Sequence, residues 1–458
     1  MAIDWKVVAV SEAAEPVLGG TPSRSIPEYW NGEISWITAK DVVAAKGRYV
    51  TEAAQTITIQ GLQESAAKIM PTGTVVITAR GTVGAIAQLG KEMAFNQTCY
   101  GFIPRKNVDQ NFLFYALKAA LSDIRGISYG TVFDTITMQS FDHLKILLPD
   151  LPEQRAIAHI LGTLDDKIEL NRRMNETLEA MARAIFKSWF VDFEPVIDNA
   201  LRAGNPIPSV LAEKAARRRE LLSRANTEGR DSCFPKHIAA LFPDRFVDSE
   251  LGPIPAGWKV VSLPKVIHIN PPRSLRKGDI APYLDMANMP MRGHTPVAII
   301  ERTFGSGMRF INGDTLLARI TPCLENGKTA YVDFLAEGQV GWGSTEYIVL
   351  CPKPPLPSEF GYCLARSTEF REFAIQSMTG TSGRQRVPAE ALSYYLLAAP
   401  PEGVAKLFGK FIRPLFLLTR SAAKESRILT ALCDTLLPKL ISGELRVKDM
   451  GRFSGNTV

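Results

Sequence analysis

The chain contains the same sequence pattern twice, and this repeat constrains its fold more than any other feature. Residues 4–10 (DWKVVAV) recur as residues 257–263 (GWKVVSL), and residues 73–80 (GTVVITAR) recur as residues 313–319 (GDTLLAR), one residue shorter. The run from 130 to 153 corresponds to the run from 380 to 402. Such a duplication predicts two similar modules with approximate two-fold symmetry. Double-stranded DNA suits such a molecule, because paired modules can read two half-sites at a fixed spacing.

Length and composition indicate a soluble protein with more than one domain. The 458 residues exceed the usual size of a single core, and 46% of them are hydrophobic and 22% charged. No stretch approaches the ~18 uninterrupted apolar residues of a membrane helix, and the first residues do not form a signal peptide. The six cysteines include no Cys-x-x-Cys pair, which gives no support for a zinc site and fits reduced thiols in the cytoplasm. The net charge of +6 permits nucleic-acid binding without requiring it.

Changes in periodicity divide the chain into segments. Residues 1–150 have the pattern of a mixed α/β module, with strands expected at 56–59, 74–77 and 144–148 and a helix at 111–122. Pro152 and Glu153 suit the start of a long helix over 151–190. The remaining predicted segments are a proline-rich linker at 191–256, a second module at 257–400, a second long helix at 401–447 and a disordered tail at 448–458.

Both long helices carry an apolar stripe at alternating spacings of three and four residues, which predicts a coiled-coil seam. In the first helix the predicted seam consists of Leu161, Leu164, Ile168, Asn171, Leu178, Met181 and Ile185, with Asn171 as the polar residue that fixes the register. In the second helix it consists of Leu415, Leu418, Ala422, Leu429, Leu432 and Leu436. Pro414 should kink this second helix or mark its true start. We expect the two stripes to pack against each other in an antiparallel pair with a module at each end.

Such a helix pair could act as a ruler. About 38 helical residues at ~1.5 Å each give roughly 57 Å, or about 17 base pairs of DNA. The alternative is that the two helices form the core of an ordinary helical hairpin. The internal repeat favours the ruler over this alternative.

Several stretches resemble the specificity (S) subunit of type I restriction–modification systems. They are residues 151–158 (LPEQRAIA), 186–195 (FKSWFVDFEP), 241–244 (LFPD), 249–252 (SELG) and 436–445 (LLPKLISGEL). The resemblance covers nearly the whole chain. It implies an α+β fold with two tandem target recognition domains, each followed by a long helix, and an antiparallel coiled-coil spacer. It departs from the family pattern at residues 401–404, where PEGV replaces the PEQR of the first copy.

The resemblance also implies the function and the partners. Each module would read one half of a bipartite site in double-stranded DNA. The helices would set the gap and dock two methyltransferase (M) subunits, which restriction (R) subunits can join. The chain itself would be non-catalytic and bind no cofactor, since the methyl donor and ATP would belong to partner subunits. The alternative, from another class, is a structural adaptor whose modules bind protein partners.

Sequence patterns that suggest catalysis are incomplete. Residues 270–273 (NPPR) lack the aromatic residue of the loop that amino-methyltransferases use, and we interpret them as a turn. Asp150, Asp165 and Lys167 fit a nuclease pattern only formally, because Asp165 and Lys167 stand two residues apart on a helix and point to different faces. The glycines near 81–84 and 305–307 are too few for a phosphate loop. We therefore predict no catalytic residues and no metal site.

Polar residues at matching places in both copies are the best candidates for DNA contacts, because duplicated modules should use matching surfaces. In the first module they are Arg80, Thr82, Asn96, Gln97, Tyr129 and Thr131. In the second module they are Arg319, Thr321, Ser344, Thr345 and Thr381. The second module adds a polar and basic loop with Arg384, Gln385 and Arg386. Arg80 and Arg319 could equally be buried arginines that pair with carboxylates at strand ends. The basic residues Arg217, Arg218 and Arg219 in the linker are expected on a solvated helix face.

Overall fold

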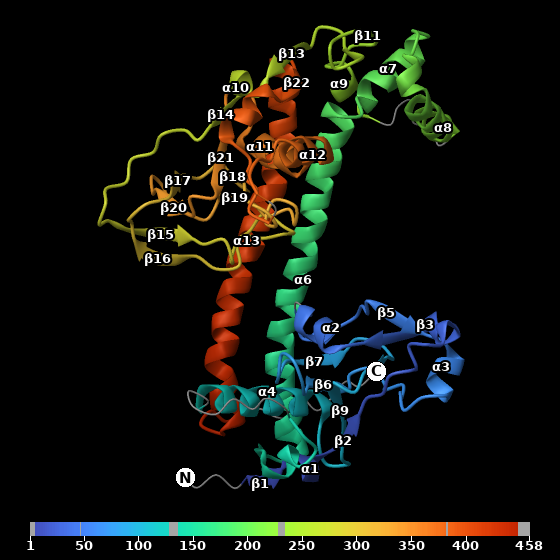
Figure 1. Ribbon diagram of the computed structural model, residues 1–458, viewed down its shortest axis with the longest axis vertical. Coiled ribbons are helices and arrows are strands. Elements are labelled where there is room, and N and C mark those ends of the chain that lie inside the picture. Colours follow the sequence, from blue (N-terminus) through green and yellow to red (C-terminus); the bar gives the residue numbers. More distant parts are fainter. Residues whose placement is uncertain (1–4, 46, 128–135, 228–233, 382, 448–458) are drawn as a thin grey trace. The chain divides into compact units, whose positions relative to one another are not determined.

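The structure, a computed structural model, describes residues 5–45, 47–127, 136–227, 234–381 and 383–447 (Figure 1). Its internal contacts divide the chain into two units. Unit 1 comprises residues 1–171 and 425–458, and unit 2 comprises residues 172–424. Each unit therefore contains one of the repeated modules and a part of both long helices. The sequence pattern had suggested the helices as segments of their own, whereas in the structure they pack into the cores of the modules.

Unit 1 contains ten strands and the first long helix among the described residues. The strands are β1 (Lys6–Ala9), β2 (Ala14–Leu18), β3 (Trp30–Ile37), β4 (Tyr49–Val50), β5 (Gln55–Ile57), β6 (Val75–Thr78), β7 (Ile86–Leu89), β8 (Ala94–Phe95), β9 (Cys99–Pro104) and β10 (Lys145–Leu148). The helices are α1 (Val10–Ala13), η1 (Pro27–Tyr29), α2 (Ala39–Ala44), α3 (Ile59–Gln63), α4 (Gln110–Ile127), α5 (Ser140–His143) and α6 (Leu151–Phe190), of which α6 continues into unit 2.

The main sheet of unit 1 has the strand order β2-β9-β6-β7-β4, and a smaller sheet has the order β5-β3-β8. Helix α4 covers the main sheet, where Phe112 and Leu113 pack with Val75, Ile77 and Phe102 in one buried cluster. The first repeated motif supplies β1, which pairs antiparallel with β10 immediately before α6. The start of the module is thereby joined to its end.

Unit 2 contains the linker, the second module and the second long helix. Its strands are β11 (Phe246–Val247), β12 (Ile254–Pro255), β13 (Lys259–Ser262), β14 (Ile267–Ile269), β15 (Ile280–Leu284), β16 (Ile300–Thr303), β17 (Met308–Phe310), β18 (Thr315–Ala318), β19 (Thr329–Tyr331), β20 (Gly341–Gly343), β21 (Tyr347–Pro352) and β22 (Leu396–Ala399). Its helices are α7 (Glu194–Ala203), η2 (Ser209–Leu211), α8 (Ala212–Thr227), α9 (Lys236–Ala239), α10 (Leu263–Val266), α11 (Ser358–Arg366), α12 (Thr368–Gln376), η3 (Ala389–Tyr394) and α13 (Glu402–Ile441), of which α13 continues into unit 1.

The second module repeats the topology of the first. Its main sheet has the order β14-β21-β18-β19, which matches β2-β9-β6-β7, and β16-β15-β20 matches β5-β3-β8. In both small sheets one neighbouring pair is parallel, β3 with β8 and β15 with β20. The recurring motif at 257–263 forms β13, which pairs antiparallel with β22 just before α13. The internal repeat read from the sequence is therefore a repeat of structure.

The two long helices run antiparallel in unit 1. Near the start of α6, the carboxylate of Glu153 accepts hydrogen bonds from Arg446, which follows the end of α13. Further along α6, Asn171 Nδ2 donates to Glu425 Oε2 at 2.8 Å and to Ser426 Oγ at 3.3 Å, both earlier in α13. In unit 2 the rings of Phe186 and Phe408 pack at 6.1 Å, so the end of α6 faces the start of α13, as the same antiparallel order requires.

The seam of α6 follows a strict three-and-four spacing, but it differs from the predicted one at Met181. This side chain is 48% exposed, and its neighbour Ala182 is buried. The seam positions are Gln154, Ile157, Leu161, Leu164, Ile168, Asn171, Asn175, Leu178, Ala182, Ile185 and Trp189. Hydrophobicity favours Met181 over Ala182, and an error of one residue turns a side chain by about 100° around the helix.

The same error occurs in α13 at Leu418 and Leu432, which are 53% and 41% exposed. The buried or half-buried positions beside them are Thr419 and Cys433. Thr419 can be buried because its hydroxyl donates to the carbonyl of Leu415 at 3.0 Å. The other predicted seam residues of this helix, Leu415, Ala422, Leu429 and Leu436, are buried or half-buried. α13 begins at Glu402, so Pro414 does not mark its start.

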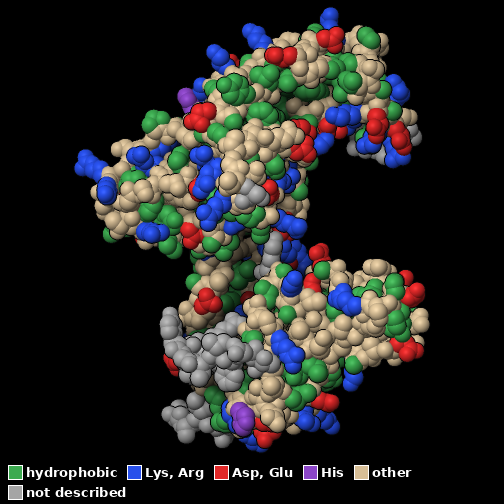
Figure 2. Space-filling view, in the orientation of Figure 1, with side chains coloured by type: hydrophobic (Ala, Val, Ile, Leu, Met, Phe, Trp, Pro, Cys, Tyr) green, Lys and Arg blue, Asp and Glu red, His purple; other side chains and the backbone are tan. Residues whose placement is uncertain are grey.

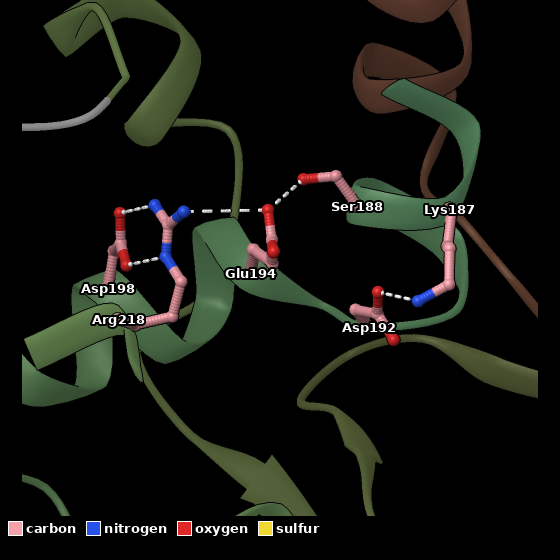
Figure 3. A network of polar contacts seen from close by, with 6 residues as sticks. All are labelled: Lys187, Ser188, Asp192, Glu194, Asp198 and Arg218. Carbon is pink, nitrogen blue, oxygen red and sulfur yellow. Dashed lines mark hydrogen bonds and ion pairs between the residues drawn. The ribbon is translucent and has the colours of Figure 1, made fainter. Parts of the chain in front are cut away.

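Helices α7 and α8 of the linker are fastened to the end of α6 by a polar network (Figure 3). Arg218 is 7% exposed and donates to both carboxylate oxygens of Asp198, with 2.7 Å between Nε and Oδ1. Its second partner is Glu194 at 3.5 Å, which also accepts from the Ser188 hydroxyl of α6 at 2.6 Å. Arg218 therefore does not lie on a solvated face as predicted, because two carboxylates of α7 neutralise its charge in a buried place.

None of the described helices combines the length and the apolar character needed to cross a membrane.

Candidate nucleic-acid interface

In unit 1, three loops lie at one end of the main sheet. Strand β2 ends at Leu18 opposite Tyr100, and β6 ends at Thr78 opposite Cys99, where β9 begins. Because β9 runs antiparallel to both strands, the loop after β2 (19–26), the turn after β6 (79–85) and the loop before β9 (96–98) share this end. The loops also touch, since the Thr21 hydroxyl donates to the side-chain oxygen of Gln97.

Unit 2 has the same arrangement. Strand β14 ends at Ile269 opposite Leu350, and β18 ends at Ala318 opposite Tyr347, where β21 begins. The loops at 270–276, 319–321 and 344–346 therefore share one end of this sheet. A further segment, described at 379–381 and 383–387, joins them through backbone hydrogen bonds from Thr321 to Gln385 (3.0 Å) and from Val387 to Arg319 (2.9 Å). In each unit, we call the end of the main sheet that carries these loops the polar end.

Of the predicted residues of unit 1, the four that the structure describes lie at its polar end. Arg80, Thr82 and Gln97 are exposed, and the Arg80 guanidinium makes no hydrogen bond or ion pair with any described residue. Asn96 is half-buried, and its side-chain oxygen accepts from the backbone N–H and the hydroxyl of Thr98 at 3.1 and 2.6 Å. Asn96 therefore shapes the turn that presents Gln97. Tyr129 and Thr131 lie outside the described residues.

The predicted residues of unit 2 divide into exposed and engaged side chains. Thr345, Thr381 and Arg384 are exposed, while Arg319, Ser344 and Gln385 are half-buried. Among the described residues the Arg384 guanidinium has no hydrogen bond or ion pair. Thr381 and Arg384 lie on the loop that joins the polar end, and Thr345 lies on the loop before β21. These three side chains are the ones that the fold leaves open to a ligand.

Two predicted contact residues of unit 2 already have partners within the chain. Thr321 is 9% exposed, and its hydroxyl accepts from the backbone N–H of Gln385 at 3.1 Å, so it connects two loops instead of facing a ligand. Arg386 is exposed, but its Nε lies 2.8 and 3.0 Å from the carboxylate oxygens of Glu346. The sequence could not show either partner, because each lies 40 or more positions away.

Two arginines that were not predicted stand out beside the polar ends. The guanidinium of Arg24, in the loop after β2, stacks 4.4 Å from the ring of Trp30. In unit 2, Arg302 of β16 stacks 4.8 Å from the ring of Tyr283, which itself packs 4.4 Å from Trp342. Stacking occupies the face of a guanidinium and leaves its N–H edge for polar partners such as phosphate or guanine. In Arg24 one N–H of this edge already donates to Gln55 Oε1 at 2.9 Å. Comparison of the repeats misses both arginines because they come from different elements.

The surface around Arg302 is basic. Figure 2 shows Lys and Arg side chains on the side of unit 2 that carries β15, β16, β17 and β20, with few acidic side chains among them. Arg276, Lys277 and Arg302 are exposed there. A surface of this kind favours a polyanionic ligand.

The motif at 270–273 is a turn. Asn270 has a φ of +52°, and its side-chain oxygen accepts from the backbone N–H of Val349 at 2.9 Å, so the side chain closes the sheet edge. Arg273 donates to the buried carboxylate of Asp314 at 2.9 Å. The motif lines a cavity of about 110 Å³ together with residues 307–309. Because the side-chain oxygen of Asn270 and the guanidinium of Arg273 already have partners, the motif has a structural role here.

The groups named in the nuclease pattern have separate partners. Asp165 accepts from the Tyr115 hydroxyl at 2.8 Å, and Lys167 lies 3.3 Å from Glu425. Burial raises the pKa of the Cys99 thiol, at the polar end of unit 1, to about 12, so this thiol is protonated and a poor nucleophile. Within the described ranges, no three His, Cys, Asp or Glu side chains gather as metal ligands would.

The chain is similar in sequence and in fold to several known proteins. Residues 2–180 match the family model of the type I restriction modification DNA specificity domain. The MjaIX type I restriction enzyme specificity subunit of Methanocaldococcus jannaschii is 26% identical, with 98% of this chain and 95% of that protein covered. The HindI specificity subunit of Haemophilus influenzae is 27% identical, with 69% and 72% covered. A solved S subunit of a type I restriction–modification system from M. genitalium shares the fold, with a TM-score of 0.53, 15% identity and 96% of both chains covered.

The first repeated module therefore resembles a DNA specificity domain, and the relative that spans both modules is a specificity subunit. Over most of its length the chain is similar to type I restriction enzyme specificity subunits, at 26–27% identity. The α+β fold with two tandem modules, each followed by a long helix, is the one that the sequence predicts.

Proposed function

We propose that this chain directs a type I restriction–modification complex to a bipartite site in double-stranded DNA, and that each module reads one half-site with its polar end. The observation that supports this most is the repetition of exposed polar loops at the same end of two matching sheets. Modules that read the same kind of ligand should present matching surfaces, as these do. The stacked arginines Arg24 and Arg302 extend each surface toward a phosphate backbone.

The partners follow from the same proposal. The antiparallel pair α6–α13 serves as the spacer between half-sites and as the docking surface for two methyltransferase subunits, which restriction subunits join for cleavage. The chain needs no cofactor for this role, since the methyl donor and ATP are bound by the partner subunits. The complex acts in the cytoplasm, where the DNA of a prokaryotic host lies.

Methylation mapping tests the proposal. A host that expresses this chain with its methyltransferase subunit is compared, by single-molecule sequencing, with a host that lacks only this chain. We expect a split motif with methyladenine in each half, present in the first host and absent from the second. Identical methylation in both hosts would contradict the proposal and favour an adaptor that binds protein partners.

The same system tests the polar end. Arg80→Ala should weaken DNA binding by the purified complex roughly tenfold at 0.1 M salt, because an arginine with a free N–H edge is removed from the interface. Arg105→Ala is the matched control, since Arg105 is also exposed but follows Pro104, at the other end of β9. Equal losses for both variants would show that unit 1 does not bind DNA with its polar end.

A further inference from the structure

In unit 1, a tyrosine of the module is bonded to a carboxylate of the long helix. The hydroxyl of Tyr115, on α4, donates to Asp165 Oδ2 of α6 at 2.8 Å. The buried Arg48 lies behind this tyrosine, with its guanidinium 5.2 Å from the ring and its Nη1 3.5 Å from the hydroxyl. Arg48 also donates to Gln88 and Asn111, so its charge is held by polar groups of the module. The contact thus joins the module core to one position of α6.

Gly162 explains how Arg48 reaches this place. Gly162 lies within α6, and a Cβ atom there would come within 2.9 Å of Arg48 Nη1 and 3.9 Å of the Tyr115 hydroxyl. A larger residue would push the guanidinium away from the helix. Glycine is a poor helix former, and its presence within α6 leaves space for the Arg48 guanidinium beside the Tyr115 hydroxyl.

Unit 2 contains the same three-part arrangement. The hydroxyl of Tyr362, on α11, donates to Glu179 Oε1 of α6 at 2.8 Å, and Arg366 Nε donates to that hydroxyl at 3.0 Å. The other four N–H groups of Arg366 are also satisfied, by the carbonyls of Met291, Gly293, Gly327 and Thr329 at 2.6–3.1 Å. All five donors of the guanidinium are thereby used. Glu179 and Tyr362 are buried.

The two arrangements occupy matching places in the repeat. Tyr115 follows β9 in the helix that covers the first main sheet, and Tyr362 follows β21 in the corresponding helix. Their carboxylate partners stand two heptads apart on α6 and so have the same position in the heptad. Burial raises the pKa of both phenols, so each hydroxyl keeps its proton and remains a donor. The arginines, in contrast, come from different elements, which shows that the tyrosine–carboxylate pair is the shared part.

We propose that the Tyr115–Asp165 and Tyr362–Glu179 pairs fix the angle at which each module is held on α6, and that they thereby set how strictly the complex selects the spacer length of its DNA site. This inference rests on the proposed function. A hydrogen bond of a buried phenol to a carboxylate is short and directional, so it restricts rotation of the module about its contact with the helix. The four residues are positioning residues, because none of them lies at a polar end.

The test measures spacer selection directly. The purified complex methylates a library of duplexes in which the two half-sites are separated by the normal spacer or by one base pair more or less. In Tyr115→Phe and in Tyr362→Phe, we expect methylation at the wrong spacers, relative to the normal one, to rise roughly fivefold to tenfold. The half-site sequences should not change. Tyr394→Phe is the control, because Tyr394 is 79% exposed, and it should keep the ratio of the natural chain.

A purely structural role would give a different result. It would lower the melting temperature and reduce methylation at all spacers in the same proportion, and a constant ratio would therefore overturn the inference. If the phenylalanine variants do not fold, Glu179→Gln and Glu179→Met decide. Glutamine keeps an acceptor oxygen for Tyr362 and should keep the ratio, whereas methionine removes the acceptor and should raise it. Equal ratios for these two variants would contradict the role of the hydrogen bond.

Failure of the inference and failure of the proposed function are distinguishable. If the natural chain directs no methylation to any split motif, the proposed function is wrong. If the natural chain methylates a split motif and every variant keeps its spacer ratio, only the positioning role is wrong.

Discussion

The two repeats join their first strand to a long helix by different chemistry. In unit 1, Trp5 Nε1 donates to the buried carboxylate of Glu153 at 3.1 Å, and Arg446 donates to the same carboxylate at 2.6 and 2.8 Å. In unit 2 the matching Trp258 packs against the rings of Phe190 and Phe193, with centroids 6.0 and 5.7 Å apart. The glutamate that matches Glu153 is Glu402, which is exposed and pairs with Lys406 one turn further along α13.

This difference shows that a duplicated fold conserves the place of a contact without conserving its chemistry. In unit 1, one carboxylate connects the residue before the first strand, the start of α6 and the segment after α13, and the strength of this link depends on two polar partners, Trp5 and Arg446, being in position. In unit 2, the matching position lies in a large aromatic cluster around Phe360 and Phe408, where many weak van der Waals contacts together provide the stabilisation. The first arrangement should respond to charge and salt, and the second to side-chain volume.

The largest effect is expected in the aromatic cluster. Phe408 is fully buried and packs against Phe190 at 4.9 Å and Phe186 at 6.1 Å, so Phe408→Ala should lower the free energy of unfolding by about 3–5 kcal/mol. Denaturation by urea, followed by tryptophan fluorescence, measures this loss. Leu417→Ala is the control on the same helix, because Leu417 is 53% exposed. A similar loss in both variants would mean that the cluster is not what stabilises this end of unit 2.

A smaller effect is expected at Glu153. Glu153→Gln keeps an acceptor for Trp5 but removes the charge that faces Arg446, and should cost about 1–2 kcal/mol of unfolding free energy, since the Arg446 side chain is 48% exposed and regains water. Glu402→Gln makes the same change at the matching position of the second repeat, and we expect no measurable loss there. The same denaturation experiment compares them. Equal effects would show that the two repeats are fastened alike after all.

The repeat, the two long helices and the antiparallel order could be predicted because each rests on a local pattern that the chain displays twice or over many turns. The seam was misplaced at Met181, Leu418 and Leu432 for a physical reason. The true positions beside them hold Ala182, Thr419 and Cys433, whose small or polar side chains give a weaker apolar signal than their exposed neighbours. Sequence periodicity measures hydrophobicity, whereas a close helix pair also accepts small residues.

The candidate residues for DNA contact were harder to predict. Arg80, chosen from the repeat, and Arg384, chosen from the basic loop of the second module, are both exposed. Thr321 and Arg386 are engaged by Gln385 and Glu346, which only the folding of distant loops brings close. The tyrosine–carboxylate pairs were missed for the same reason. Asp165 attracted attention as part of a nuclease pattern, and its actual partner is a tyrosine 50 residues earlier in the chain.

The smallest expected effect is a difference in salt dependence between the Glu153 contact of unit 1 and the aromatic cluster of unit 2. The coupling free energy between Glu153 and Arg446, taken from a double-mutant cycle with Glu153→Gln and Arg446→Gln, should fall by a few tenths of a kcal/mol (~0.3) when salt rises from about 0.05 to about 0.5 M, because one partner is half-exposed. The cost of Phe408→Ala should stay constant over the same range, because no charge is involved. A coupling free energy that does not change with salt would mean that Glu153 acts through its hydrogen-bond geometry alone. The two repeats would then differ in the geometry of this contact and not in its dependence on charge.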